Sequence, residues 1–190
     1  MMRISLLILT VIFISSCTHK KESIATKKHT LKLFKMDHVN SRAILAIDSE
    51  TMYYAGANGD IGFTKNDGKK WDTLSIRYQD TIAPNFRSIA TNGTAVFALS
   101  IGNPALLYKI TNTIPVLVYK EHHEKVFYDA MKFFPDGKHG IAVGDPTENC
   151  ASIILTSDGG NNWTKIPCSK LPTLEKEEAF FAASNTNIKI

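Results

Sequence analysis

The chain has 190 residues and a formal net charge of +4, with 22 lysines and arginines against 18 aspartates and glutamates. This excess is too small to argue for a nucleic-acid-binding surface, because many of the lysines lie together near the N-terminus. With 44% hydrophobic residues, the composition is that of a globular protein with enough apolar side chains for a core.

The first residues have the features of a lipoprotein signal peptide. Arg3 precedes an apolar run over residues 4–14, which is shorter than the roughly 20 residues of a membrane span. The Ile-Ser-Ser-Cys sequence at residues 14–17 resembles a bacterial lipobox, so we expect residues 1–16 to be removed and Cys17 to be lipidated. The alternative is an ordinary signal peptide with a chance cysteine. Thr18 after the cysteine favours the outer membrane by analogy, so we expect an exported protein held at the outer membrane or the periplasmic face.

A basic tether is predicted over residues 17–38. Few apolar residues accompany its lysines, which are Lys20, Lys21, Lys27, Lys28, Lys32 and Lys35. Two arrangements stay open, a solvated stalk or a segment lying on anionic lipid headgroups. Removal of the signal peptide takes away Arg3 and no acidic residue, so the mature net charge is 21 minus 18, or +3.

Residues 39–190 contain an internal repeat. Ile44, Ile89 and Met131 occupy equivalent positions at spacings of 45 and 42 residues, the length of one four-stranded propeller blade. Helical periodicity is not sustained anywhere, which favours an all-β fold. We expect three blades plus the first strand of a fourth over residues 179–183. Because three blades do not close a ring, we expect an N-terminal fragment of a six- to eight-bladed propeller, the alternative being a ring completed by another chain.

Two hairpin turns carry the most specific pattern in the chain. Residues 156–163 lie between two runs of strand-forming residues, and residues 64–71 form a degenerate copy. A short polar side chain at the third position accepts hydrogen bonds from backbone N–H groups, a glycine supplies a positive φ, and a tryptophan covers the turn. These residues are predicted to be structural.

The first pattern, T-x-D-x-G-x-x-W, resembles the Asp-box or BNR repeat of sialidase-like β-propellers. It is complete at Thr156, Asp158, Gly160 and Trp163, whereas the copy at Thr64, Asn66, Gly68 and Trp71 has asparagine in place of the aspartate. The longer frame over residues 128–144 is similar to repeats of the photosystem II stability and assembly factor family. It also resembles exported bacterial propeller lipoproteins that are often named oxidoreductases. These resemblances imply a propeller fold and, for the assembly factor family, protein partners.

Two cysteines remain after lipidation of Cys17. Cys150 and Cys168 lie at equal distances from Gly159, the centre of the hairpin turn, so in an antiparallel hairpin they face each other. In an oxidising compartment this predicts a disulfide. Two reduced buried thiols are the alternative.

A sialidase-like activity requires several arginines for the substrate carboxylate, a tyrosine nucleophile and an acid/base carboxylate. The mature chain has only Arg42, Arg77 and Arg87, and Arg87 lacks the isoleucine-proline that follows in the sialidase signature. We therefore predict no catalytic residues. Arg42 and Arg87 begin the innermost strands of successive blades and are candidates for binding in the central funnel.

No metal or cofactor is predicted. The Glu-His-His-Glu sequence at residues 121–124 has ligand-type side chains, but adjacent strand residues point to opposite faces, so a polar connection between blades is the better interpretation. Phosphate-cradling glycine loops and dinucleotide fingerprints are missing, and no residue pattern supports a redox activity.

The resulting hypothesis is an exported, lipid-anchored propeller that acts as a non-catalytic protein-binding or assembly scaffold. Its partners are the membrane, through the anchor, and a protein. The alternative is a carbohydrate-active protein, either a sialidase-like glycosidase or a glycan-binding protein, with key residues beyond residue 190.

Overall fold

The computed structural model describes residues 31, 33–181 and 187–190. The chain divides into two units, Met1–Leu33 and Phe34–Ile190, and all of the described strands belong to the second. The signal peptide, Cys17 and nearly all of the tether's lysines lie outside the described residues. Within the described part, none of the helices has the length and apolar character needed to cross a membrane.

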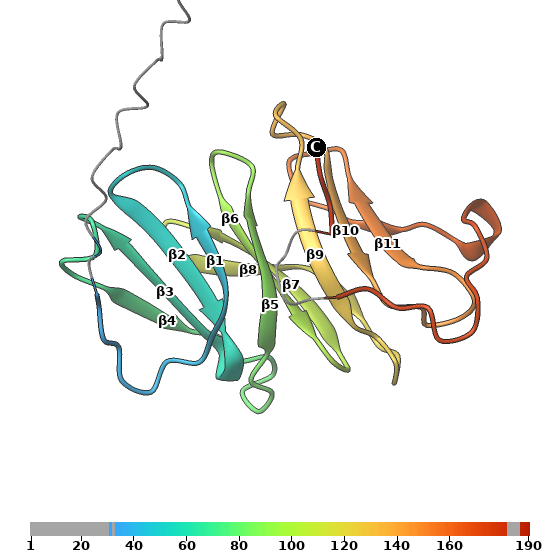
Figure 1. Cartoon of the computed structure of the whole chain (residues 1–190), viewed down its shortest axis with the longest axis horizontal. Helices are drawn as coiled ribbons and strands as arrows, with labels where there is room; N and C mark the ends of the chain where they lie inside the picture. The colour runs from blue at the N-terminus through green and yellow to red at the C-terminus, as the bar shows by residue number, and fades with distance from the viewer. Residues whose placement is uncertain (1–30, 32, 182–186) are drawn as a thin grey trace, which may run out of the picture. The chain divides into compact units, whose positions relative to one another are not determined.

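Three four-stranded antiparallel sheets make up the second unit, and each is a meander in chain order (Figure 1). We call them blades 1, 2 and 3. Blade 1 contains β1 (Ser41–Ala46), β2 (Thr51–Gly56), β3 (Asp60–Lys65) and β4 (Asp72–Ser75). Blade 2 contains β5 (Asn85–Thr91), β6 (Val96–Ile101), β7 (Ala105–Thr111) and β8 (Ile114–Glu121). Blade 3 contains β9 (Tyr128–Phe133), β10 (Gly140–Gly144), β11 (Ser152–Thr156) and β12 (Thr164–Lys165).

The blades pack through their first strands, with β5 in contact with both β1 and β9. Blade 2 is therefore covered on both faces, which explains why β6 is a nearly continuous apolar run, Val-Phe-Ala-Leu-Ser-Ile, with five buried residues. Two short 3-10 helices complete the unit, η1 (Ala57–Gly59) after β2 and η2 (Cys168–Lys170) after β12.

Two apolar seams hold the blades together. Ala43, Ala55 and Ile61 of blade 1 pack against Phe86, Ala98 and Leu106 of blade 2 in the first seam. In the second, Phe97, Leu99 and Leu107 of blade 2 meet Tyr128, Ala142 and Ile154 of blade 3. Because these side chains are fully or nearly fully buried, truncation of one of the leucines to alanine costs about 2–5 kcal/mol.

The predicted all-β architecture of four-stranded blades is confirmed. Residues 179–181 form no strand, and residues 182–183 lie outside the described residues, so the fourth blade stays a prediction. Near the end of the chain, Ile188 is buried against Ala130 and Val143 of blade 3.

Candidate functional site

In the Asp-box turn of blade 3, the side chains of Thr156 and Asp158 form hydrogen bonds within the turn. Thr156 Oγ1 accepts hydrogen bonds from the backbone N–H groups of Gly160 at 3.0 Å and Asp158 at 3.4 Å, and donates to Asp158 Oδ1 at 2.8 Å. The same Oδ1 accepts from the amides of Asn161 at 2.9 Å and Asn162 at 3.0 Å. Donation from the Asn162 side chain and then from its backbone lowers the pKa of Asp158 to about 2. The Asp158 carboxylate therefore caps the turn, because its oxygens accept hydrogen bonds from residues of the same loop.

The degenerate copy in blade 1 has the same core geometry. Thr64 Oγ1 accepts from Gly68 N at 3.0 Å, and Asn66 Oδ1 accepts from Lys70 N at 2.9 Å. Gly68 and Gly160 have φ values of +76° and +80°, which side-chain-bearing residues rarely adopt. A single amide oxygen therefore replaces the aspartate in this turn.

Cys150 and Cys168 are placed for a disulfide, with their Cα atoms 5.5 Å apart. They lie just outside the hairpin ladder, because β12 is only two residues long and Cys168 opens η2. The last backbone pairing before them is the hydrogen bond from Ile166 N to Ile153 O at 2.8 Å. The bond itself stays a prediction, and its test is given below.

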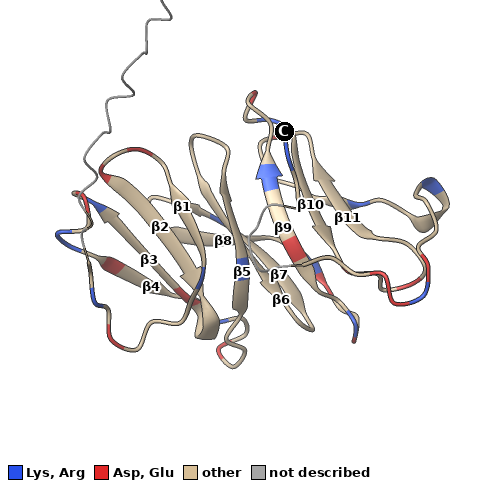
Figure 2. Cartoon of the chain, in the orientation of Figure 1, with Lys and Arg blue, Asp and Glu red and all other residues tan. Residues whose placement is uncertain are grey.

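Arg42, Arg87 and Asp129 occupy the same place in the three blades. Each is the extra residue at a register irregularity of the first strand. There the first strand advances by two residues while the neighbouring strand advances by one. A bulge of this kind turns the side chain away from the regular pleat. Arg42 is exposed, Arg87 is half-buried and Asp129 is fully buried. Figure 2 shows the charged segments of β5 and β9 on neighbouring strands.

Asp129 was missed by the sequence analysis, although its position two residues before Met131 matches Arg42 and Arg87. Neither carboxyl oxygen has a hydrogen-bond partner among the described residues. Burial, followed by repulsion from the Asp145 carboxylate, raises the pKa of Asp129 to about 7, and the backbone N–H of Asp145 and then the positive charge of Arg87 oppose this rise. Asp145 itself accepts a hydrogen bond from Phe180 N at 2.8 Å.

Glu121 joins blades 2 and 3. Its Oε2 accepts hydrogen bonds from the hydroxyls of Tyr119 and Tyr128, each at 2.7 Å, and its Oε1 pairs with Lys165 Nζ. Burial alone raises the pKa of Glu121, but donation from Lys165, Tyr128 and Tyr119 outweighs it, and the net pKa is lowered. Burial also raises the pKa of both tyrosines, which is unfavourable for a tyrosine nucleophile. This network links blades 2 and 3 and has a structural role.

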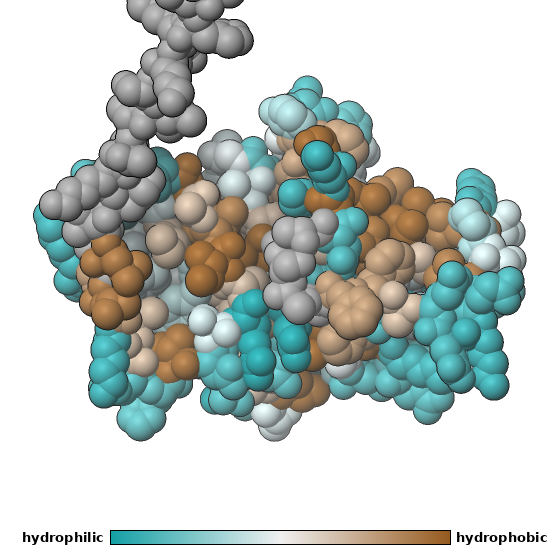
Figure 3. Space-filling model, in the orientation of Figure 1, coloured by the Kyte–Doolittle hydropathy of each residue, from teal (hydrophilic) through white to brown (hydrophobic). Residues whose placement is uncertain are grey.

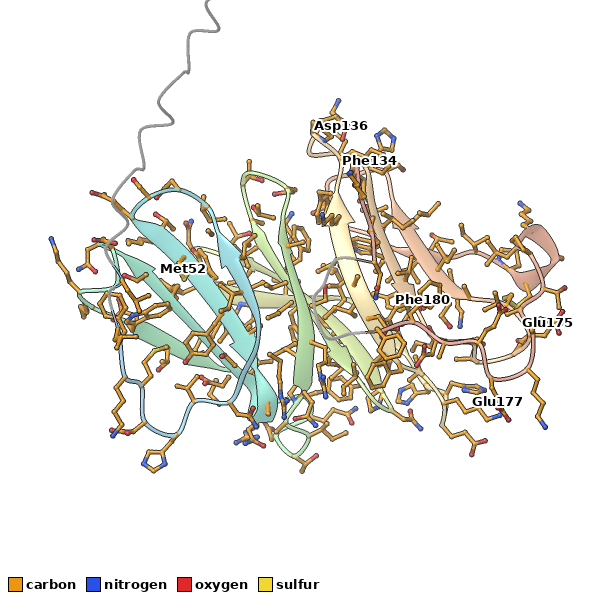
Figure 4. The ribbon with its side chains drawn as sticks, viewed as in Figure 1. Met52, Phe134, Asp136, Glu175, Glu177 and Phe180 are labelled. Atoms are coloured by element: carbon orange, nitrogen blue, oxygen red, sulfur yellow. A yellow bond between two sulfur atoms is a disulfide. The ribbon has the colours of Figure 1, made fainter. Side chains whose placement is uncertain are left out.

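Metal binding has no support in the part of the chain that the structure describes, where no three His, Cys, Asp or Glu side chains are close enough to share an ion. The acidic segment at residues 175–178, with Glu175 and Glu177 labelled in Figure 4, is exposed. One of its carboxylates, Glu178 Oε2, accepts a hydrogen bond from Glu175 N at 2.7 Å. The carboxylates at residues 175–178 are thus solvated, and one of them forms a hydrogen bond within its own segment.

A groove of about 180 Å³ lies between blades 1 and 2. Its aromatic wall is the stacked pair of Tyr53 and Phe63, with ring centroids 5.5 Å apart. Lys65 Nζ lies 5.9 Å from the centroid of Phe63 and is the single charged residue of the lining. The remaining lining residues are Ile47, Thr51, Ile61, Leu74, Thr91, Gly93, Thr94, Ala95, Val96, Ile110, Asn112 and Thr113.

Comparison with solved structures supports the fold. A structure of YCF48 bound to a D1 peptide superposes with a TM-score of 0.52 at 18% identity, covering 67% of this chain and 39% of the YCF48 chain. The chain is a β-propeller repeat protein that resembles YCF48. An ancestral GH74 enzyme aligns with a TM-score of 0.39 at 10% identity, covering 70% of this chain and 26% of the enzyme.

The propeller protein thus spans well under half the length of these two chains. Searches by sequence add nothing to the structural likeness: no family model and no curated protein matches the chain.

Proposed function

We propose that this propeller protein is an exported, lipid-anchored scaffold that binds a protein partner without catalysing a reaction. The groove between blades 1 and 2 carries the proposal, because it combines an apolar floor, an aromatic wall and a polar rim in a pre-formed concave site. The peptide bound to YCF48 supports a protein partner for a fold of this type.

The charged residues of the first strands support binding better than catalysis. Arg42 and Arg87 lie at equivalent bulges, but the third such position holds a buried aspartate instead of a further arginine. The described tyrosine-carboxylate contacts are those of Tyr119 and Tyr128 with Glu121 and of Tyr54 with Asp60, and the pKa of each tyrosine is raised. This arrangement does not supply the arginine clamp and activated tyrosine of a sialidase-like site.

Glycan binding is the second candidate, and one observation favours it. The stacked Tyr53 and Phe63 rings, bordered by threonine hydroxyls, are side chains of the kind that pack against sugar rings. Any carbohydrate-cleaving activity would then depend on residues outside those described.

The proposal is tested by chemical crosslinking of the full chain in its own membrane fraction, followed by purification and identification of attached proteins. A reproducible protein partner is expected. Recovery of no partner, together with hydrolysis of a glycoside by the same preparation, would contradict the scaffold function and favour the carbohydrate-active alternative.

A further inference from the structure

The two seams between blades differ at the end where the Asp-box turn lies. In the seam between blades 2 and 3, three aromatic rings fill the space. Trp163 lies 5.6 Å from Phe133 and 6.5 Å from Phe97, and Phe97 lies 4.6 Å from Phe133, measured between ring centroids. Trp163 is only 7% exposed, so this seam is closed.

The strand registers identify the equivalent residues in the seam between blades 1 and 2. Ile44 pairs with Tyr54, and the equivalent Ile89 pairs with Ala98, so Tyr54 corresponds to Ala98. The residue before each, Tyr53 in blade 1 and Phe97 in blade 2, is therefore also equivalent. By the same registers, Thr91 of blade 2 stands where blade 3 has Phe133.

The tryptophan position is equally well defined. In blade 3, Leu155 pairs with Thr164, the residue after Trp163, and in blade 2 the corresponding Lys109 pairs with Val116, the residue after Pro115. Pro115 therefore occupies the place of Trp163. Of the three aromatic rings that close one seam, the other seam retains one.

The connecting turns differ in the same way. The Asp-box turn of blade 3 is fixed across its seam by hydrogen bonds from Asn92 Nδ2 to Gly159 O at 2.9 Å and from Lys109 Nζ to Asn161 Oδ1 at 2.8 Å. Blade 2 instead joins β7 to β8 through Asn112 and Thr113 alone. The groove of about 180 Å³ lies at this place, with Tyr53, Thr91 and both turn residues in its lining.

The groove has the size and chemistry for one aromatic side chain. An apolar protein cavity of about 150 Å³ accommodates a benzene molecule, so the volume suffices for a ring. Ile61, Val96 and Ile110 provide an apolar floor, and the threonines provide a polar rim. The one formal charge of the lining is the positive charge of Lys65, whose side chain is exposed and accessible to a carboxylate.

We propose that the groove binds an aromatic residue, tryptophan above all, of a partner peptide, and that an acidic residue beside it pairs with Lys65. The partner thereby supplies the ring that blade 3 supplies to its own seam. This inference rests on the proposed scaffold function and specifies the chemistry of the partner. The aromatic side chain provides most of the affinity, because the ion pair forms at an exposed lysine where solvent screens it.

The first test uses acetylated and amidated octapeptides with a central Asp-Trp pair, titrated calorimetrically into the full chain. The Asp-Trp peptide is expected to bind at least tenfold more tightly than the same peptide with Trp changed to Ala. Changing its Asp to Asn is expected to weaken binding about two- to fivefold. Equal affinity of the Trp and Ala peptides would overturn the proposal, as would binding of free oligosaccharides in place of the peptides.

The second test fills the groove from within the chain. Pro115 pairs with the groove residue Ile110 on the edge strand β8, so Pro115→Trp places an indole on the groove side of blade 2. Val116→Trp is the matched control, because the next residue of the strand points to the opposite face and is 54% exposed. We expect Pro115→Trp to abolish peptide binding while its thermal midpoint stays at or above that of the wild type. Unchanged binding by a folded Pro115→Trp variant overturns the site.

The charge is tested separately with Lys65→Gln, for which Lys69→Gln in the nearby Asp-box turn is the control. Only Lys65→Gln is expected to remove the preference for Asp over Asn in the peptide. The crosslinking experiment distinguishes the two proposals. Capture of the same protein by wild type and by Pro115→Trp retains the scaffold function and rejects the groove, whereas capture by the wild type alone supports both.

Discussion

Asp129 is a buried carboxyl group whose ionisation destabilises the folded protein. Its pKa is raised to about 7 in the folded protein, against about 3.9 in an unfolded chain, so the folded state holds the proton more tightly. The stability linked to this proton is fully present below about pH 4 and is lost as the pH rises through 7. We expect Asp129→Asn to raise the free energy of unfolding at pH 8, by at most about 4 kcal/mol, and to have a much smaller effect at pH 5.

Urea unfolding of the two proteins at both pH values measures this difference. Asp136→Asn serves as a control of opposite sign. The side chain and backbone of His139 lower the pKa of exposed Asp136 to about 2, so its stabilising contribution is present above about pH 4 and is lost as the pH falls through 2. A gain from Asp129→Asn that is equal at pH 5 and pH 8 would show that burial of the charge is not the cause.

The side chain of Asp158 is expected to stabilise the folded protein by capping the Asp-box turn. Asp158→Ala removes the acceptor of two backbone amides and is expected to cost about 1–2 kcal/mol of unfolding free energy. Asp158→Asn is expected to cost less than half as much, because Asn66 performs the same role in blade 1 with one oxygen. Thermal or urea unfolding distinguishes the two variants, and equal losses would refute the capping role.

At the residue scale, the sequence reveals groups that belong to a local pattern and hides those that depend on distant partners. The turn residues could be predicted because their bonds lie within a few positions of one another. Glu121 was attributed only to a polar connection, since its three partners come from β8, β9 and β12. Asp129 is recognisable only by superposing the repeats and then measuring its burial.

At the scale of elements, we expect the hairpin of β11 and β12 to be stabilised by its two cysteines. The ladder of β12 has only two pairs, so the predicted disulfide would link the two chain segments where backbone pairing ends. A loop of 18 residues corresponds to about 3 kcal/mol in the chain-entropy treatment of crosslinks. We expect the Cys150→Ser, Cys168→Ser double variant to be less stable than the oxidised protein by about this amount.

The bond itself is verified by counting free thiols in the unfolded, unreduced mature protein. No reaction from Cys150 and Cys168 is expected, and reaction of both would refute the disulfide. The wild type under reducing conditions is the matched control, and it should lose the same stability as the double variant.

Strand positions were predictable to within a few residues because each blade repeats the same order of strands and turns. The groove between blades 1 and 2 could not be predicted in this way. It results from a difference between repeats, a short turn and Pro115 in blade 2 against a long turn and Trp163 in blade 3, whose effect depends on how neighbouring sheets pack.

For the whole molecule, the predicted anchor is the property to test first. If Cys17 is lipidated, cells given a labelled fatty acid should incorporate the label into the wild-type protein and not into a Cys17→Ser variant. The variant should then leave the membrane fraction, because acyl chains supply the anchoring free energy. Cys168→Ser is the control, and labelling of Cys17→Ser would refute the lipobox.

Blade 1 and blade 2 present one repeat position in different surroundings. Ile44 is 65% exposed, whereas Ile89 is 2% exposed and Met131 is fully buried. Met52, labelled on β2 in Figure 4, is likewise 37% exposed where its counterpart Val96 is buried. On blade 3, Leu155 is 40% exposed, and apolar surface is visible over β10 and β11 in Figure 3. The sequence shows the three first-strand positions Ile44, Ile89 and Met131 as equivalent, and only packing separates them.

The groove in the first seam illustrates one way in which a repeat protein gains binding specificity. Absence of the long turn and of two aromatic rings from blade 2 leaves the groove open without any new binding residue, and the intact blade 3 shows the shape of the side chains that fill such a space. In such an array, a binding site forms where one repeat lacks side chains that the other repeats have. The side chains present in the other repeats then indicate the chemistry of the ligand.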